Sequence, residues 1–513
     1  MTTTITQPAP TATEPAPVGR RASAVLALAR FEARELLLQI PVLLIFALYV
    51  VLVVWRLLHQ EGMDDFPVLN TVDRSTQGEP LLFAVALLIC TNAAALRSRK
   101  NGTAQQFDVL AMDPWRRTLA HVLSVVPYAA LTAVVVAAQF LREALKPGAI
   151  GHGSLGELAV GPLTVLLAGV TGVLLARLLP TAFVLAPFVL AVYLLIAVAS
   201  AAASEGAWTG WLSPVVFSGT SGGDPVPSDL LGRSAGWHAL YVAALCALVI
   251  CAALLLSGGR TRAIRTATAL ALAATAAGVI GQLPRDDGAL EAARRTASEA
   301  PQKVQSCTVY GGSTYCSFPE WNGVRSDWAG VVDRVRSAAG GTAAEAALTI
   351  RQRIDTSSGV EADSALSPSV TPHQVTVGTH WGGNRVPEFA VGVASVLVTG
   401  SEEAAAQELC DARAVTIMWL VLGTDPTPLT TFQNLRLDDS TDGSGVILAP
   451  TEPLSLTAHQ TTVLRELLAR PRAEETARVK AHWTELTSPN TSTAEAAKLL
   501  GVAVPKGAES CEE

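Results

Sequence analysis

Charged residues are scarce in this chain: Asp, Glu, Lys and Arg make up 16% of its 513 residues, whereas half of its residues are hydrophobic. About a quarter of the residues of a typical soluble domain are charged, so this composition indicates a membrane protein. The scarcity is uneven, because hydrophobic residues form long blocks up to Leu283 and alternate with charged residues from Pro284 onward. The sequence therefore predicts a hydrophobic part followed by a polar one.

The polar part has no excess of basic residues. It holds 19 Lys and Arg against 29 Asp and Glu, a net charge of −10. Since affinity for nucleic acids comes from clustered Lys and Arg, we expect no nucleic-acid partner.

Motifs of the common catalytic and metal sites are also lacking. Neither the phosphate-binding G-x-x-x-x-G-K-[ST] nor the zinc-binding H-E-x-x-H occurs. Gly219 to Gly223 fits G-x-S-x-G but lies in a Pro-rich loop without the strand and helix that a hydrolase nucleophile requires, so we interpret it as a linker. His373 and His380 have no Cys pair nearby and are typical of surface histidines. We predict no catalytic residue, metal or cofactor in this chain.

The N-terminal segments differ from the rest of the hydrophobic part. Residues 1–18 are rich in Thr, Pro and Ala without periodicity, which predicts a disordered tail, and no cleavable signal follows them. Residues 23–40 form an amphipathic pattern that predicts a helix lying in the lipid headgroup layer. Its predicted apolar face carries Leu26, Ala29, Ala33, Leu36 and Ile40.

Seven hydrophobic blocks follow within a membrane domain that we place at residues 20–283. A helix needs roughly 20 apolar residues to cross a bilayer. The blocks of about this length are residues 41–58, 81–96, 118–141, 158–178, 181–203, 237–256 and 266–283. The second block is short, and the last is rich in Ala. Whether the last block crosses the membrane decides on which side of the membrane the polar part lies.

Basic residues in the short loops predict the orientation, because they concentrate on the cytoplasmic side. With a cytoplasmic N-terminus, 13 basic residues lie inside and five outside. Those inside are Arg20, Arg21, Arg30, Arg34, Arg97, Arg99, Lys100, Arg116, Arg117, Arg177, Arg260, Arg262 and Arg265. The protein is then expected to be a multi-pass cell-membrane protein with residues 284–513 as an extracytoplasmic domain.

The extracytoplasmic domain is predicted to be α+β. Helical patterns cover residues 327–339, 342–355, 402–414, 457–469, 473–486 and 493–500, and strand-like runs cover 374–379 and 415–422. Its four cysteines would lie in an oxidising compartment. Cys307 and Cys316 flank a Gly-Gly turn and are predicted to staple a hairpin, which leaves Cys410 and Cys511 as the second pair among three possible connectivities.

The loop at residues 97–118 carries the most informative pattern. Thr103 can cap a short helix with Phe107 and Leu110 on one face, and Asp113-Pro114 stops that helix before the next one begins. Either this loop is a basic anchor on the cytoplasmic side, or it docks a cytoplasmic partner. Its candidate docking residues are Arg97, Arg99, Lys100, Phe107, Leu110, Arg116 and Arg117.

The order of these segments resembles the permease subunit of type-2 ATP-binding-cassette (ABC) exporters. Its elements are the amphipathic "ARFEAREL" helix, two spans and the loop "RSRKNGTAQQFDVLAMDPWRRTLAH". In that family the loop holds a coupling helix that contacts an ATP-binding subunit. Family members commonly have six spans, so a seventh is a departure, although actinobacterial permeases with a Cys-containing C-terminal outer domain are similar.

The expected function is therefore that of a transporter subunit and not of an enzyme. The resemblance implies a separate ATP-binding subunit and a homodimer or a heterodimer with a second permease in the lipid membrane. The spans hold few ionisable residues, which favours a hydrophobic or amphipathic cargo. A membrane-anchored extracytoplasmic enzyme, or a sensor whose outer domain binds a ligand, remains an alternative.

Overall fold

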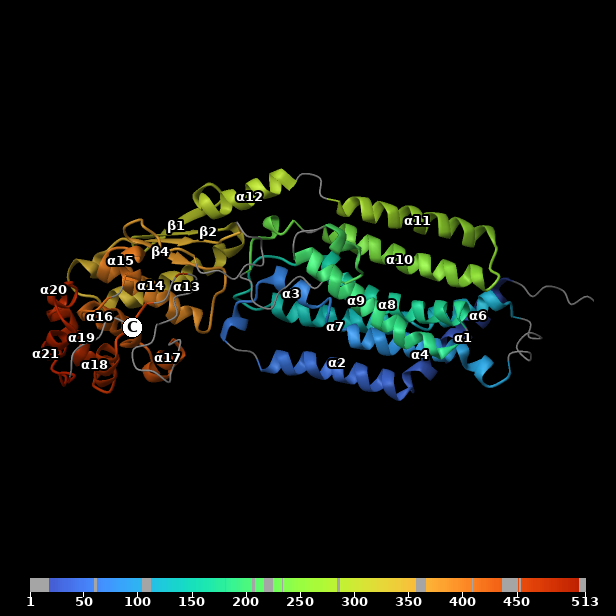
Figure 1. The fold of residues 1–513 in the computed structure, drawn as a ribbon, viewed down its shortest axis with the longest axis horizontal. Coiled ribbons are helices and arrows are strands. Elements are labelled where there is room, and N and C mark those ends of the chain that lie inside the picture. The colour runs from blue at the N-terminus through green and yellow to red at the C-terminus, as the bar shows by residue number, and fades with distance from the viewer. Residues whose placement is uncertain are drawn as a thin grey trace, which may run out of the picture.

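The computed structural model describes residues 18–59, 62–103, 112–179, 181–204, 208–215, 225–232, 234–283, 287–356, 366–407, 409–435, 451 and 454–506. Figure 1 shows an elongated molecule with a bundle of long helices in its N-terminal half and a smaller domain at one end of this bundle. The tail predicted for residues 1–18 lies outside the described residues except for Val18, which begins the first helix.

Among the residues that the structure describes, six helices are long and apolar enough to cross a membrane, which indicates a multi-pass membrane protein. They are α2 (Ile40–Leu58), α4 (Leu81–Lys100), the stretch Pro114–Ala144, α8 (Leu155–Leu178), α10 (Ala235–Leu256) and α11 (Arg262–Gln282). The stretch Pro114–Ala144 comprises α6 (Pro114–Leu123) and α7 (Val126–Ala144). The block predicted at 266–283 is thus one of the six.

The block predicted at 181–203 is also helical, but its apolar part is shorter than the others. Its first residues form a 3-10 turn, η2 (Ala182–Val184), and α9 (Leu185–Ser204) follows. The apolar part of α9 within the described side chains is Leu185–Ala201.

α9 nevertheless connects opposite ends of the bundle. Arg177 in the last turn of α8 lies close enough to Arg117 of α6 for their like charges to repel each other. The hydroxyl of Ser257, just after α10, lies 2.7 Å from that of Thr118 in α6. α8 and α10 therefore end at the same end of the bundle. The start of α10 lies beside η3 (Trp208–Leu212), where Tyr241 donates a hydrogen bond to the carbonyl of Leu212. α9 carries the chain between these two ends (Figure 1).

The bundle is built around close contact between α4 and α8. A Cβ atom on Gly172 of α8 would lie only 2.3 Å from the carbonyl oxygen of Leu88. Thr91 donates a hydrogen bond to the carbonyl of Gly169 and Asn92 to that of Gly172, at 2.9 and 3.1 Å. Small residues and side-chain hydrogen bonds of this kind stabilise packing between membrane helices.

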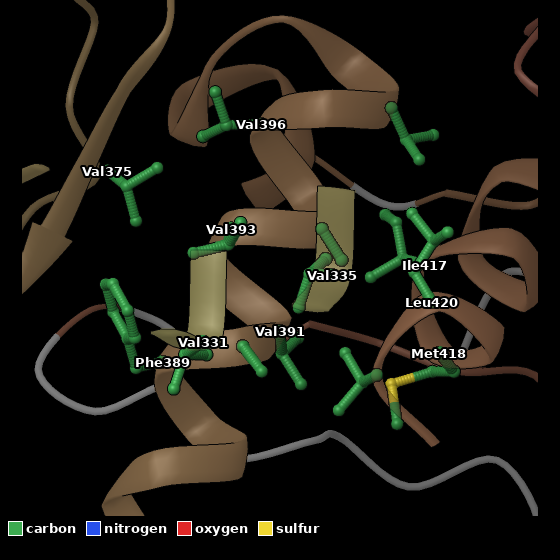
Figure 2. Packing of buried hydrophobic residues seen from close by; sticks show 14 of the residues in the cluster. Val331, Val335, Val375, Phe389, Val391, Val393, Val396, Ile417, Met418 and Leu420 are labelled. Carbon is green, nitrogen blue, oxygen red and sulfur yellow. The ribbon is translucent and has the colours of Figure 1, made fainter. Parts of the chain in front are cut away.

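The second domain contains one mixed four-stranded sheet in the order β1-β2-β3-β4. Strand β1 (Ser306–Tyr310) pairs antiparallel with β2 (Ser313–Ser317), and β2, β3 (Thr349–Gln352) and β4 (Gln374–Val377) run parallel. One face of the sheet is covered by helices α13 (Arg325–Ala338) and α14 (Arg385–Thr399), and α16 (Ala412–Leu422) packs against these helices on the side away from the sheet. Figure 2 shows this core, where Val331 and Val335 of α13 pack near Val391 and Val393 of α14.

The domain's predicted elements are partly correct. Two predictions match single elements already described: the helix at 327–339 is α13, and the strand at 374–379 is β4. Three further predicted helices, at 457–469, 473–486 and 493–500, correspond in turn to α18 (Ala458–Leu468), to α19 (Arg472–Ala481) with α20 (Trp483–Leu486), and to α21 (Thr493–Leu499). The helix predicted at 342–355 is wrong, because these residues form the 3-10 turn η7 (Gly341–Glu345) and strand β3 instead. That at 402–414 is split into α15 (Glu402–Ala406) and the start of α16. The sequence analysis did not identify α12 (Asp287–Glu299) or α17 (Pro428–Leu435).

The strand predicted at 415–422 is wrong, because these residues belong to helix α16. Val415 to Leu422 are buried all round, and a run that is apolar on every side has no periodicity to separate strand from helix. Asp411 caps the helix by accepting a hydrogen bond from the amide of Arg413 at 2.9 Å.

Loops of the bundle complete the core of the second domain. Val68 and Ile150, which form a parallel bridge, lie in the same hydrophobic cluster as the residues that cover the sheet. Val68 precedes the short helix α3 (Leu69–Ser75), which follows η1 (Gly62–Asp65). Glu320 in η6 (Pro319–Val324) accepts a hydrogen bond from the amide of Ser228, the first residue of η4 (Ser228–Leu230), at 2.7 Å. The domain is therefore packed directly onto the bundle.

Candidate docking site at the basic end of the bundle

The ends of α4 and α6 hold most of the predicted docking residues. Arg97, Arg99 and Lys100 lie in the last turn of α4, and Arg116 and Arg117 lie in the first turns of α6. We call this end of the molecule the basic end. Phe107 and Leu110, predicted to be the apolar docking residues, lie outside the described residues, as does all of 104–111.

Local sequence signals set the two boundaries of this loop. α4 stops at Asn101, and Gly102 adopts a left-handed conformation with φ of 67°, which glycine tolerates best after a helix. The hydroxyl of Thr103, predicted as a cap for the next helix, donates to the carbonyl of Ser98 at 3.2 Å. Pro114, which was predicted to stop the preceding helix, begins α6, because its fixed φ suits the first turn and its missing N–H costs nothing there.

Arg97 links the loop to helix α1 (Val18–Leu37), the predicted interfacial helix. Its guanidinium lies 3.7 Å from the carboxylate of Glu35 and 4.0 Å from that of Glu32. Burial raises the pKa of Glu32, while Arg97 opposes this shift and Glu35 adds to it. His121 of α6 lies 3.9 Å from the same Glu32 carboxylate. Arg97 is thus engaged within the chain, where it holds α1 against α4.

Glu32 and His121 were missed by the sequence analysis. Glu32 was placed on the polar side of the amphipathic helix, but it is buried. The available signal was the pair of acidic residues, Glu32 and Glu35, in a helix that is predicted to lie on the same side of the membrane as the basic run at residues 97–100. Opposite charges in two segments on the same side favour an ion pair between them.

The buried face of α1 agrees only in part with the predicted one, of which Ala29 and Leu36 are buried. Val25 and Ala29 pack against Ala120 of α6, whereas Leu26 and Ile40, predicted to be on the apolar face, are 50% and 76% exposed. Ile40 in fact begins α2. The face is rotated because Glu32, held by Arg97, belongs to it. The arginines Arg30 and Arg34 point away from the bundle and are exposed.

The remaining basic residues differ in how firmly they are held. Arg116 pairs with Asp113 at 3.2 Å, and its guanidinium lies 5.1 Å from the ring centroid of Trp115. Arg99 and Lys100 are exposed. The basic end therefore combines a fixed support, made of α1, α4 and α6, with exposed cations beside the loop.

A second polar cluster lies at the opposite end of the bundle, where α8 begins. Gln77 donates a hydrogen bond to Glu157, and Asp73 accepts one from the amide of Ser154 at 2.7 Å. Arg56 of α2 forms an ion pair with Glu79. These side chains tie the helices to the loops that carry the second domain. The sequence analysis missed this cluster, because isolated polar residues next to apolar blocks give no pattern.

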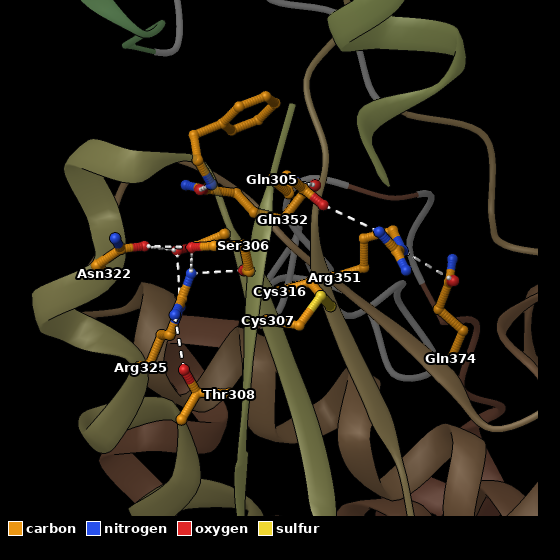
Figure 3. The surroundings of a disulfide bond; sticks show 12 residues. Gln305, Ser306, Cys307, Thr308, Cys316, Asn322, Arg325, Arg351, Gln352 and Gln374 are labelled. Carbon is orange, nitrogen blue, oxygen red and sulfur yellow. Dashed lines mark hydrogen bonds between the residues drawn. A yellow bond between two sulfur atoms is a disulfide. The ribbon is translucent and has the colours of Figure 1, made fainter. Parts of the chain in front are cut away.

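The predicted disulfide between Cys307 and Cys316 is confirmed, with a sulfur–sulfur distance of 2.04 Å (Figure 3). It joins opposite residues of β1 and β2. Arg325 lies beside it and donates hydrogen bonds to Ser306 and Thr308. Cys410 is also disulfide-bonded, and Cys511, its predicted partner, lies outside the described residues.

Comparisons with known proteins give no further guidance. No protein-family model, curated protein or solved structure matches this chain.

Proposed function

We propose that the protein is the permease subunit of an ATP-driven exporter of the type that its segment order resembles, the type-2 ABC exporters. The observation that carries this proposal is the basic end of the bundle. There, α1 is held by Arg97 against the end of α4, and exposed Arg99 and Lys100 flank the loop. Such a support suits a loop that transmits the motion of a cytoplasmic ATP-binding subunit to the membrane helices.

The proposal includes an orientation. α9 acts as a seventh crossing, because it carries the chain between the same two ends as its neighbours. With the basic end in the cytoplasm, the second domain lies outside, in agreement with its disulfide. The outer domain would cap the exit of the pathway.

The surface of the bundle supports a membrane pathway for a hydrophobic or amphipathic cargo. α2 and α9 expose large apolar side chains along their length, which suits contact with lipid or with a second permease. We propose that two copies, or this chain and a homologous one, form the pathway.

The docking loop provides the test. Phe107→Asp together with Leu110→Asp places two charges in the predicted apolar contact, so a bound ATP-binding subunit should no longer co-purify, and ATP-dependent transport should stop. The matched control is Val370→Asp with Leu429→Asp, two exposed apolar residues of the outer domain that are 67% and 55% exposed. If both variants retain the associated ATPase and transport, the docking proposal is wrong. A detergent extract without any associated ATPase, under conditions that retain known complexes, would reject the exporter function itself.

A further inference from the structure

The outer edge of strand β1 is open. Cys307 lies opposite Cys316 with the two Cα atoms 4.1 Å apart. In antiparallel sheets, opposite residues are about 4.5 Å apart when they do not hydrogen-bond to each other and about 5.5 Å apart when they do. The backbone N–H and C=O of Cys307 therefore point away from β2, as do those of Val309 two residues later. Among the described residues, nothing outside the β1–β2 pair hydrogen-bonds to these groups.

The other edge of the same sheet is closed by its own chain. Glu402 is buried beside β4, where its carboxylate accepts hydrogen bonds from the amide and the hydroxyl of Thr376. It also accepts one from the amide of Ser369 at 2.8 Å. The fold thus satisfies the outward amide of β4 and leaves those of β1 open.

Strand β1 also lacks the features that normally keep an edge from pairing. Edge strands are usually protected by Lys, by Pro, by a bulge or by a covering segment. No charged residue lies between Lys303 and Glu320. Val309 and Tyr310 are 64% and 40% exposed.

The open edge is held in a fixed shape. The Cys307–Cys316 disulfide joins β1 to β2, and the turn between them has Gly311 and Gly312 at φ of 53° and 82°, which a tight hairpin turn requires. Arg325 of α13 supports β1 from the side through hydrogen bonds to Thr308 and Ser306 (Figure 3). A rigid edge loses little conformational entropy when a ligand binds.

We propose that the edge of β1 binds an extended, uncharged polypeptide segment, which adds to the sheet as a further strand. A row of alternating outward donors and acceptors is matched by the backbone of another polypeptide in extended form. The segment is uncharged because β1 itself carries no charged side chain, and the charges beside its turn, Asp333 and Arg336 near Gly311, already pair with each other at 2.7 Å. A second copy of this chain is a poorer fit, since edge-to-edge pairing would bring together two domains of net charge −10. This inference does not depend on export.

The test uses the full-length protein in detergent and a synthetic probe, the acetylated and amidated peptide (Thr-Val)4. Hydrogen–deuterium exchange at the amides of Cys307 and Val309 should be fast in the free protein. With the probe at ten times its Kd, exchange at these two amides should slow about tenfold, while that of Thr308, already paired with β2, should not change. The matched probe carries N-methyl groups on every residue, which removes the backbone donors from both of its edges, and it should give no protection.

Two variants distinguish binding at the edge of β1 from nonspecific binding of the probe. Val309→Lys puts a charge on the open edge and should abolish the protection, whereas Val370→Lys, at a valine of similar exposure, should leave it unchanged. Thermal unfolding confirms that both variants fold. Absence of binding, equal protection by the N-methylated probe, or protection elsewhere in the chain would overturn the proposal. A further result would also overturn it: slow exchange at Cys307 and Val309 in the free protein, together with cross-links between two β1 strands. That result would assign the edge to a second copy.

Discussion

Glu402 is the residue whose environment most directly sets a pH dependence. Burial raises the pKa of its carboxyl, although the hydrogen bonds from Thr376 and Ser369 and the nearby Arg353 act in the opposite direction. A carboxyl whose pKa is raised on folding binds more protons in the folded state between its two pKa values. Its contribution to stability is therefore complete below the ordinary pKa of Glu and is lost as pH rises through the raised value.

We predict that Glu402→Gln reduces this pH dependence. The wild-type protein should lose more stability than the variant when the pH rises from 5 to 8. The variant should also be less stable by about 1–3 kcal/mol at pH 5, because its amide N–H group meets an N–H of Ser369 or Thr376 that then has no acceptor. Thermal unfolding at both pH values measures this. Exposed Glu403 gives the control Glu403→Gln, and an equal pH slope in wild type and Glu402→Gln would contradict the prediction.

The disulfide of the β1–β2 hairpin should stabilise the second domain. Replacing Cys307 and Cys316 by Ser should lower the free energy of unfolding by about 2–4 kcal/mol, because the closed loop restricts the unfolded chain. Denaturant unfolding checks this value. The single variant Cys307→Ser should give a similar loss, and an unchanged transition midpoint in both would show that the bond is not structural.

Cysteines were the residues that could be predicted best. Cys307 and Cys316 stand on either side of a Gly-Gly turn, and this spacing, together with the predicted oxidising location, favoured the pair that the structure contains. Glu32, Asp73 and Glu402 could not be found in this way. Their roles depend on partners far away in sequence, and a single acidic residue carries no information on which backbone it will face.

Helix packing between α4 and α8 predicts the direction in which a Gly-to-Ala substitution changes stability. Gly172→Ala should destabilise the bundle by about 1–3 kcal/mol, because the added methyl group meets the backbone carbonyl of Leu88. Intrinsic helix propensity predicts the opposite, since Ala is favoured over Gly by about 1 kcal/mol. The control is Gly236→Ala in α10, where nothing lies within 4 Å of the added Cβ atom. Thermal unfolding in detergent should show a lower midpoint for the first variant and no decrease for the second.

Elements with one clear environment were predictable and those with mixed environments were not. The long apolar helices, α13 and α21 follow from periodicity and composition alone. α16 was mistaken for a strand because it is buried on all sides, and β3 was taken for a helix because only four residues form it. The buried face of α1 was misjudged because an ion pair, Glu32 with Arg97, overrides the apolar pattern.

The division into a membrane part and a polar part could be predicted, but their attachment could not. Val68 and Ile150 belong to loops of the bundle and yet pack in the core of the second domain, together with Phe66, whose ring lies edge-on to that of Trp381. Nothing in these short loops indicates which distant surface they will meet. The shared core attaches the second domain directly to the loops of the bundle.

The proposed orientation of the whole molecule rests on the number of crossings, which is odd if α9 is the seventh. Arg262, at the start of α11, and Lys303, after α12, are both exposed and lie on opposite sides of α11. With a cytoplasmic N-terminus and seven crossings, a cysteine at Arg262 faces the cytoplasm and one at Lys303 faces outward. In intact cells, a membrane-impermeant maleimide should therefore label Lys303→Cys and spare Arg262→Cys, and permeabilised cells should show labelling of both. The native free cysteines Cys90, Cys246 and Cys251 are buried and give a low background. If α9 does not cross, α10 and α11 reverse direction, and Arg262→Cys becomes the labelled variant, which would place the disulfide-bonded domain in the reducing cytoplasm.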